Sequence, residues 1–130
     1  MPLPRWLGEG LASQVAYAAV EDDRRHRVPE LTRLRSRVEG GLWPGALPGA
    51  AAFEDAAQRS DADLSAWLAV EVVIAELGRE GVVEALQRSA GDPAVSASDG
   101  ERTGWVLASL GVSRAWLEER WRAELVRRTT

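Results

Sequence analysis

The amino-acid sequence predicts an all-α fold, a compact single-domain bundle of about five to seven helices. Apolar residues recur at the three- and four-residue spacing of an amphipathic helix along most of the chain. Residues that typically cap helices stand where these patterns begin and end. No segment alternates apolar and polar residues with a period of two, so we do not expect a sheet.

Size and composition fit one domain over residues 1–130. A chain of 130 residues that is 45% hydrophobic and 28% charged can bury one core without covalent cross-links. The chain contains no cysteine, which excludes disulfides and thiolate zinc sites. No apolar run reaches the roughly 20 residues of a membrane helix, and the N-terminus does not resemble a signal peptide. We therefore expect no membrane partner and, by default, a cytoplasmic protein.

Two helices are expected in the first forty residues. The first should run from about Leu7 to Arg25, because apolar side chains follow one helical stripe there. The second should begin at Pro29, since proline suits the first position of a helix. It should end near Val38, where two glycines follow.

The middle of the chain predicts a loop and then a buried helix. Residues 40–50 are rich in glycine and proline and should form an ordered loop held by Trp43 and Leu47. A short helical turn around residues 53–59 should follow. The next helix should open at Ser60 as its N-cap and close at Gly78. Its apolar residues cover most of the circumference, which is typical of a central buried helix.

Three further helices are expected in the C-terminal part. They should span about residues 79–90, 101–110 and 114 onwards, and Ser113 should cap the last one. Residues 91–100 should form a mobile loop. The last helix should turn a stripe of three side chains toward the core, namely Leu117, Trp121 and Leu125.

A motif near the start of the chain carries a family resemblance. Residues 6–12, Trp-Leu-Gly-Glu-Gly-Leu-Ala, resemble the Trp-Leu-x-Glu-Gly-x-Ala motif of the gluzincin (peptidase MA-like) zinc metallopeptidases. Three later stretches, at residues 64–70, 76–86 and 110–125, resemble further segments of that family in the same order. The resemblance implies an all-helical C-terminal half of such a peptidase domain. It also implies that Glu9 corresponds to the third zinc ligand. From the residues alone, Glu9 is interpreted as an ordinary acidic side chain in the first turn of a helix, where the helix dipole favours it.

The part of the family pattern that carries the chemistry is missing. The chain has no HExxH segment and only one histidine, so it cannot supply the two imidazoles and the general base of a His₂Glu site. We expect no cofactor in the isolated chain, although zinc is the cofactor of the resembling family. Two origins are open: a fragment or truncated remnant of a longer peptidase, or a short protein that kept the helical half as an interaction module.

A surface beside Glu9 is the predicted contact for a protein partner. Ala12, Ser13 and Ala16 lie at three, four and seven residues from Glu9, so they share its helix face. Small side chains there would let another helix approach closely. In the resembling family that helix is the HExxH helix. If upstream sequence or a partner chain supplied it, an active zinc metallopeptidase would result, which is the alternative function.

A second alternative function rests on the arginines of the chain. All sixteen basic residues are arginines, and six of them fall between Arg24 and Arg37 against one glutamate. Such a run could bind nucleic acid or an acidic partner, but a solvated helix face is the simpler interpretation. His26 is interpreted as a solvated histidine at a helix end.

Two further side chains, on the later helices, have predicted surroundings. Glu71 falls on the wheel of the central helix among apolar residues, so it should have an arginine partner or an edge position. Trp116 is the tryptophan expected on the outer side of the last helix.

Overall fold

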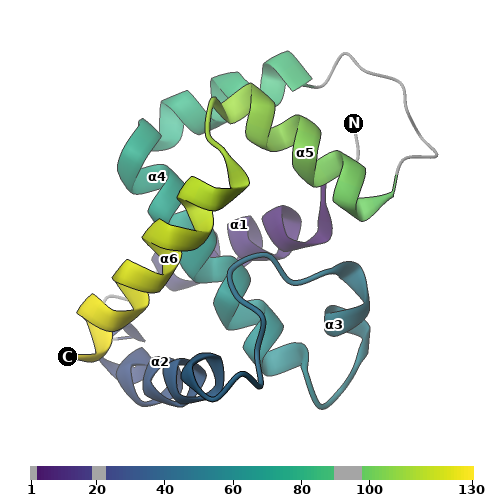
Figure 1. Cartoon of the computed structure of the whole chain (residues 1–130). Coiled ribbons are helices and arrows are strands. Elements are labelled where there is room, and N and C mark those ends of the chain that lie inside the picture. The colour runs from purple at the N-terminus through teal and green to yellow at the C-terminus, as the bar shows by residue number, and fades with distance from the viewer. Residues whose placement is uncertain (1–2, 19–22, 90–97) are drawn as a thin grey trace.

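Six α-helices and no β-strand are present in the part of the chain that the structure describes, which confirms the predicted all-α class (Figure 1). The computed structural model describes residues 3–18, 23–89 and 98–130, without the side chains of residues 17–18, 23–26 and 89. The helices are α1 (Arg5–Ala18), α2 (Asp23–Glu39), α3 (Ala50–Glu54), α4 (Arg59–Ser89), α5 (Asp99–Leu110) and α6 (Arg114–Thr129). Within these residues one hydrophobic core holds the bundle together.

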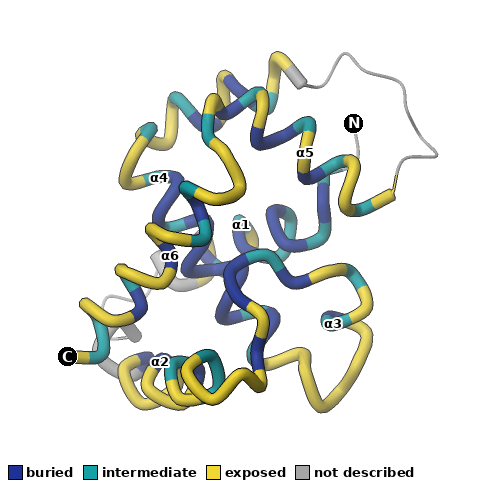
Figure 2. The backbone as a smooth tube through the Cα atoms, in the orientation of Figure 1, coloured by how far each residue is buried: buried dark blue, intermediate teal, exposed yellow. Residues whose placement is uncertain are grey.

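The long helix α4 is the centre of the bundle, as the sequence predicted. It contacts α1, α3, α5 and α6, and residues 64–70 in its first half are buried without a break (Figure 2). Six of these seven residues are apolar, so this segment packs on all sides. At Gly78 the backbone has φ +74°, a conformation that glycine adopts without steric cost. The predicted helix end at Gly78 is therefore confirmed, and the two helices expected on either side of it form the two arms of α4.

Helix α1 packs against α4 over the most extensive contact in the bundle. Gly10 makes this possible, because a Cβ atom at Gly10 would lie 2.5 Å from the carbonyl oxygen of Ala66 and 2.6 Å from Cγ2 of Val70. Trp6 and Leu7, one turn earlier, are almost completely buried. The Trp6 indole N–H donates to Thr103 Oγ1 at 3.1 Å, so α1 is also tied to α5.

The glycine- and proline-rich loop after α2 is pinned to α4 and α6. Trp43 is buried, and its indole N–H donates to Ser65 Oγ at 2.8 Å and to the Gly45 carbonyl at 3.1 Å. The backbone N–H of Ala46 donates to Glu118 Oε2 on α6 at 3.0 Å. Leu47 packs half-buried against the core. The predicted ordered loop held by Trp43 and Leu47 is confirmed.

The predicted start of the second helix was wrong. Helix α2 begins at Asp23, and Pro29 lies inside it. Because an interior proline removes one backbone hydrogen bond and crowds the preceding turn, the sequence argument placed the helix start there. Arg27 on one side of Pro29 and Leu31 on the other are both buried, and their packing explains why the helix continues through the proline. The first helix was expected to reach Arg25, but α1 ends at Ala18, and residues 19–22 lie outside the described part.

Three other boundaries differ by a few residues. The short helix α3 occupies 50–54 rather than 53–59, and α4 begins at Arg59, so Ser60 is not its N-cap. A turn at Asp55 leads into α4: its carboxylate accepts from the N–H of Ala57 at 2.8 Å, and its carbonyl accepts from Arg59. The predicted mobile loop at 91–100 falls mostly on residues outside the description.

The ends of α5 and α6 show clear capping. Ser98 accepts a hydrogen bond from the N–H of Glu101, so α5 starts at Asp99, two residues before the expected start. The Ser-x-x-Glu spacing is a capping box that the sequence argument missed. Ser113 caps α6 as predicted and accepts from the N–H of Trp116 at 3.0 Å. The predicted inward stripe of α6 is also confirmed, since Leu117, Trp121 and Leu125 are buried. No helix among the described residues is both long and apolar enough to span a membrane.

Candidate functional site

Glu9 lies near the start of α1 and is held by an arginine one turn earlier. Arg5 Nε donates to Glu9 Oε1 at 2.9 Å, and Arg5 Nη1 donates to Glu54 Oε1 on α3 at 2.7 Å. The Arg5 guanidinium also lies 5.4 Å from the ring centre of Phe53. The hydrogen bonds to Glu54 and Glu9 raise the pKa of Arg5 above its ordinary value. One oxygen of Glu9 is thus engaged with a cation that belongs to the same helix.

A second carboxylate, Asp63 on α4, is close enough to Glu9 for the two charges to interact. Burial raises the pKa of Asp63, and the negative charge of Glu9 raises it further. Arg59 Nε lies 3.8 Å from Asp63 Oδ2, whereas Asp63 Oδ1 is buried without a hydrogen-bond partner among the described atoms. A carboxyl group with a raised pKa, such as that of Asp63, is found at functional sites more often than elsewhere. The proximity of Asp63 to Glu9 was not predicted from the sequence, because the two residues are far apart in the chain.

The residues around Glu9 do not form a zinc site by themselves. A structural or catalytic zinc site takes three or four nitrogen, sulfur or carboxylate ligands. Within the described residues, no group of three or more His, Cys, Asp or Glu side chains is arranged to hold a metal ion. The side chain of His26 lies outside those residues. The assignment of Glu9 as a metal ligand remains an expectation from the resemblance.

The helix face that Glu9 shares with Ala12, Ser13 and Ala16 is open to solvent. Ala12 and Ala16 are exposed, and Ser13 and Glu9 are partly exposed. Val15, which flanks this face, keeps 65% of its surface exposed. The opposite side of α1 is the one buried against α4, through Gly10 and Gln14. This surface, called here the outer face of α1, is free among the described residues, and the partner that would cover it remains a prediction.

Four arginines of α2 have described side chains, and they lie in different surroundings. Arg27 is buried, and its guanidinium lies 4.3 Å from the ring centre of Trp67. Arg35 pairs with Glu39 at 2.8 Å, and Arg37 pairs with Asp61 on α4 at 2.6 Å. Arg33 is exposed. These four arginines thus differ in burial and in their partners, and nucleic-acid binding remains an untested prediction.

A groove between α4 and α6 is a feature that the sequence argument missed. It has a volume of about 520 Å³ and is lined from α4 by Glu71, Val72, Ala75 and Glu76, and from α6 by Trp116, Arg120, Ala123, Glu124, Arg127 and Arg128. The α6 residues recur at spacings of three and four, which could have indicated a shared helix face.

Ion pairs within the groove neutralise several of its charges. Glu124 accepts hydrogen bonds from both Arg127 and Arg128. The bond from Arg127 has the largest effect on the pKa of Glu124. Together with the bond from Arg128 it lowers that pKa to about 2, although burial acts in the opposite direction. Arg128 Nη1 also lies 3.9 Å from Glu71 Oε1. The predicted arginine partner for Glu71 is thereby confirmed. Trp116 is half-buried, with the Arg120 guanidinium 5.7 Å from its ring centre.

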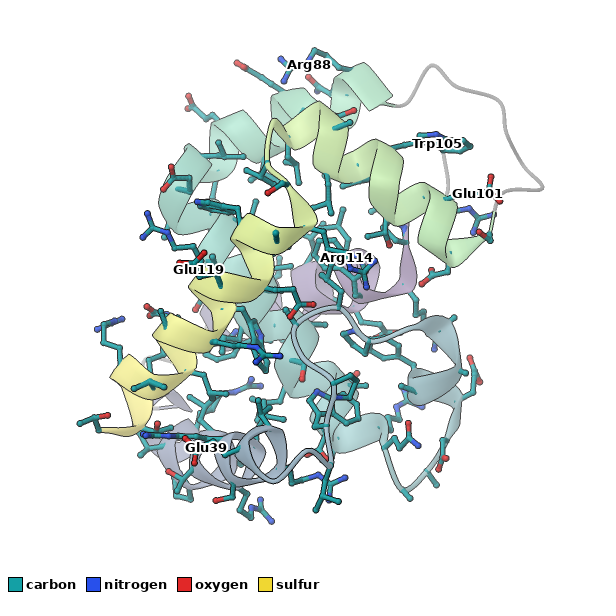
Figure 3. The ribbon with its side chains drawn as sticks, in the orientation of Figure 1. Glu39, Arg88, Glu101, Trp105, Arg114 and Glu119 are labelled. Carbon is teal, nitrogen blue, oxygen red and sulfur yellow. The ribbon has the colours of Figure 1, made fainter. Side chains whose placement is uncertain are left out.

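Side chains that project outward from the two later helices can be followed in Figure 3. Trp105 extends from α5, and Glu119 extends from α6. Trp105 is half-buried, whereas Glu119 is exposed. Of the tryptophans, Trp105 and Trp116 are thus the two that reach the surface to an appreciable extent.

Comparisons of the chain with protein-family models, with curated proteins and with solved structures find no match.

Proposed function

We propose that this chain is a non-catalytic helical interaction module that binds a helix of a partner protein on the outer face of α1. The observation that supports this proposal is the exposure of Ala12, Val15 and Ala16 on a helix whose other side packs against α4. Alanines let a second helix approach closely, and the flanking valine offers apolar area to bury.

The distribution of charged residues along α1 also supports its outer face as the binding surface. From Gly10 to Ala18, α1 carries no charged residue, and depletion of charge is typical of the centre of a protein–protein interface. The Arg5–Glu9–Glu54 ion pairs lie at one end of this segment and would form a polar rim. The resemblance to gluzincins adds that the related helix in that family packs beside the residue corresponding to Glu9.

Site-specific photo-crosslinking tests this proposal. A photoreactive amino acid at Ala16, in the full chain expressed in its own host, should yield one reproducible adduct. The same amino acid at Val83, which is 51% exposed on α4, should not yield it. Introducing Ala12→Arg into the Ala16 probe should abolish the adduct, because a long charged side chain would block helix packing. Adducts that are equal at both positions, or absent at both, would contradict the proposal.

The alternative, a zinc peptidase completed by another chain, predicts a different measurement. A synthetic helix containing HExxH should confer stoichiometric zinc binding on the protein, and Glu9→Gln should weaken it. The non-catalytic proposal predicts zinc affinity no better than micromolar for the isolated chain, since one carboxylate and one histidine make a poor site. Tight zinc binding by the chain alone would refute it.

A further inference from the structure

Each wall of the groove between α4 and α6 carries one charged side chain that has no ion-pair partner among the described residues. Arg120 on α6 stacks on Trp116 but forms no ion pair among the described residues, and Glu76 on α4 likewise has none there. Both side chains are exposed. The remaining charged residues of the groove pair with one another through Glu124 and Arg128. The groove therefore presents a positive wall and a negative wall to whatever enters it.

Small and apolar side chains also line the groove. Val72 and Ala75 come from α4 and Ala123 from α6, and the Trp116 ring lies toward one end. Small residues on both walls let a third backbone come close. The lining residues of α6 run from Trp116 to Arg128, a rise of roughly 18 Å, and those of α4 run from Glu71 to Glu76, a rise of roughly 8 Å. A partner helix laid along α6 would contact this wall over about three turns and α4 over one to two, and an amphipathic helix in a groove is a recurring mode of recognition.

We propose that the α4–α6 groove binds an amphipathic helix of a partner protein that carries an acidic residue on one flank of its apolar stripe and a basic residue on the other. The acidic flank pairs with Arg120 and the basic flank with Glu76. Opposite charges across an interface fix register and select partners more than they add affinity. The site is distinct from the outer face of α1 and does not depend on the function proposed for it.

Three fluorescent helical peptides with the same apolar stripe test the proposal against the full chain. One has an acidic and a basic flank, one has two acidic flanks, and one has two basic flanks. Fluorescence anisotropy should show the mixed peptide binding about tenfold more tightly than either of the others, a difference of about 1.4 kcal/mol. A peptide with its flanks exchanged is not a useful control, because it could bind in the reverse direction.

Charge reversal in the protein should change the preference in a defined way. Glu76→Arg should favour the doubly acidic peptide, and Arg120→Glu the doubly basic one. Glu84→Arg, at an exposed position on α4 that does not line the groove, should leave the order unchanged. Circular dichroism should confirm that each variant is folded. The proposal would be overturned if no peptide bound, or if the three peptides bound equally. It would also be overturned if both groove variants ranked the peptides as the unmodified protein does. Ala12→Arg on α1 should not alter these affinities, so the proposals for the two surfaces can be tested independently.

Discussion

The indole N–H of Trp121 on α6 donates a 3.1 Å hydrogen bond to the backbone carbonyl of Ser65 on the central helix. The hydroxyl of the same serine accepts from Trp43 in the loop after α2. Ser65 and both tryptophans are buried. One residue of α4 thus ties together a loop and a helix that are far apart in the sequence, and this arrangement positions α6 as one wall of the groove.

Replacing Trp121 by phenylalanine should therefore destabilise the fold. The substitution removes the indole donor and leaves a small cavity in the core, which together should lower the free energy of unfolding by about 2–4 kcal/mol. Urea unfolding measures this loss of free energy, provided that the dependence of the free energy on urea concentration has the same slope in the variant and in the unmodified protein. Trp116→Phe on the same helix is the control, because Trp116 is half-buried and donates no side-chain hydrogen bond among the described residues. An equal loss in both variants would contradict the role given to the Ser65 contact.

Two glycines of α1 should respond oppositely to alanine. At Gly10 the new Cβ would collide with the Ala66 carbonyl at 2.5 Å, so Gly10→Ala should cost about 1–3 kcal/mol of stability. At Gly8 a Cβ would meet nothing within 4 Å, so Gly8→Ala should gain about 0.5–1 kcal/mol through higher helix propensity. Thermal unfolding of the two variants compares them directly. Loss of stability at Gly8 as well would show that α1 is not packed on α4 as described.

The helical class, the central helix and its break were predictable because they depend on local sequence. Apolar residues around the whole circumference of α4 can only be buried, and Gly78 ends the pattern. The start of α2 was not predictable, because packing of Arg27 and Leu31 carries the helix through Pro29. The start of α5 also depends on local sequence, because the Ser98–Glu101 spacing is that of a capping box.

The surroundings of Glu9 could be predicted only in part. The spacing of Glu9, Ala12 and Ala16 placed these residues on one face, and that face is exposed. The neighbour Asp63 is more than fifty residues away in sequence, and no local pattern connects it to Glu9. The α4–α6 groove arises in the same way, from the packing of two helices whose separate sequences show only their own faces.

Glu124 should stabilise the protein above its unfolded-state pKa. Arg127 and Arg128 hold its folded-state pKa at about 2, below the ordinary 4.5, so the stabilisation is present above about pH 4.5 and is lost as the pH falls toward 2. Because the pair is partly exposed and screened, Glu124→Gln should cost on the order of 1 kcal/mol at pH 7. The difference from the unmodified protein should shrink to zero near pH 2 in urea unfolding. Glu119→Gln, on the same helix but without an ion pair among the described residues, is the control for the loss of a carboxylate at pH 7 and should leave the free energy of unfolding unchanged there.

Asp63 should have the opposite pH dependence. Burial, followed by the nearby charge of Glu9, raises its folded-state pKa above the unfolded value. The neutral, protonated form of its carboxyl group is thus the one that the folded state favours: this contribution to stability is fully present below the unfolded-state pKa and is lost as the pH rises through the folded-state pKa. Asp63→Asn should accordingly raise stability at pH 7 relative to the unmodified protein, and the gain should diminish toward acidic pH. Glu9→Gln removes the second cause of the shift, so in that variant the NMR-monitored titration of Asp63 should move to lower pH. If Asp63 titrated at the same pH with and without the Glu9 charge, the two carboxylates would not be coupled, and the outer face of α1 would have no electrostatic connection to the central helix.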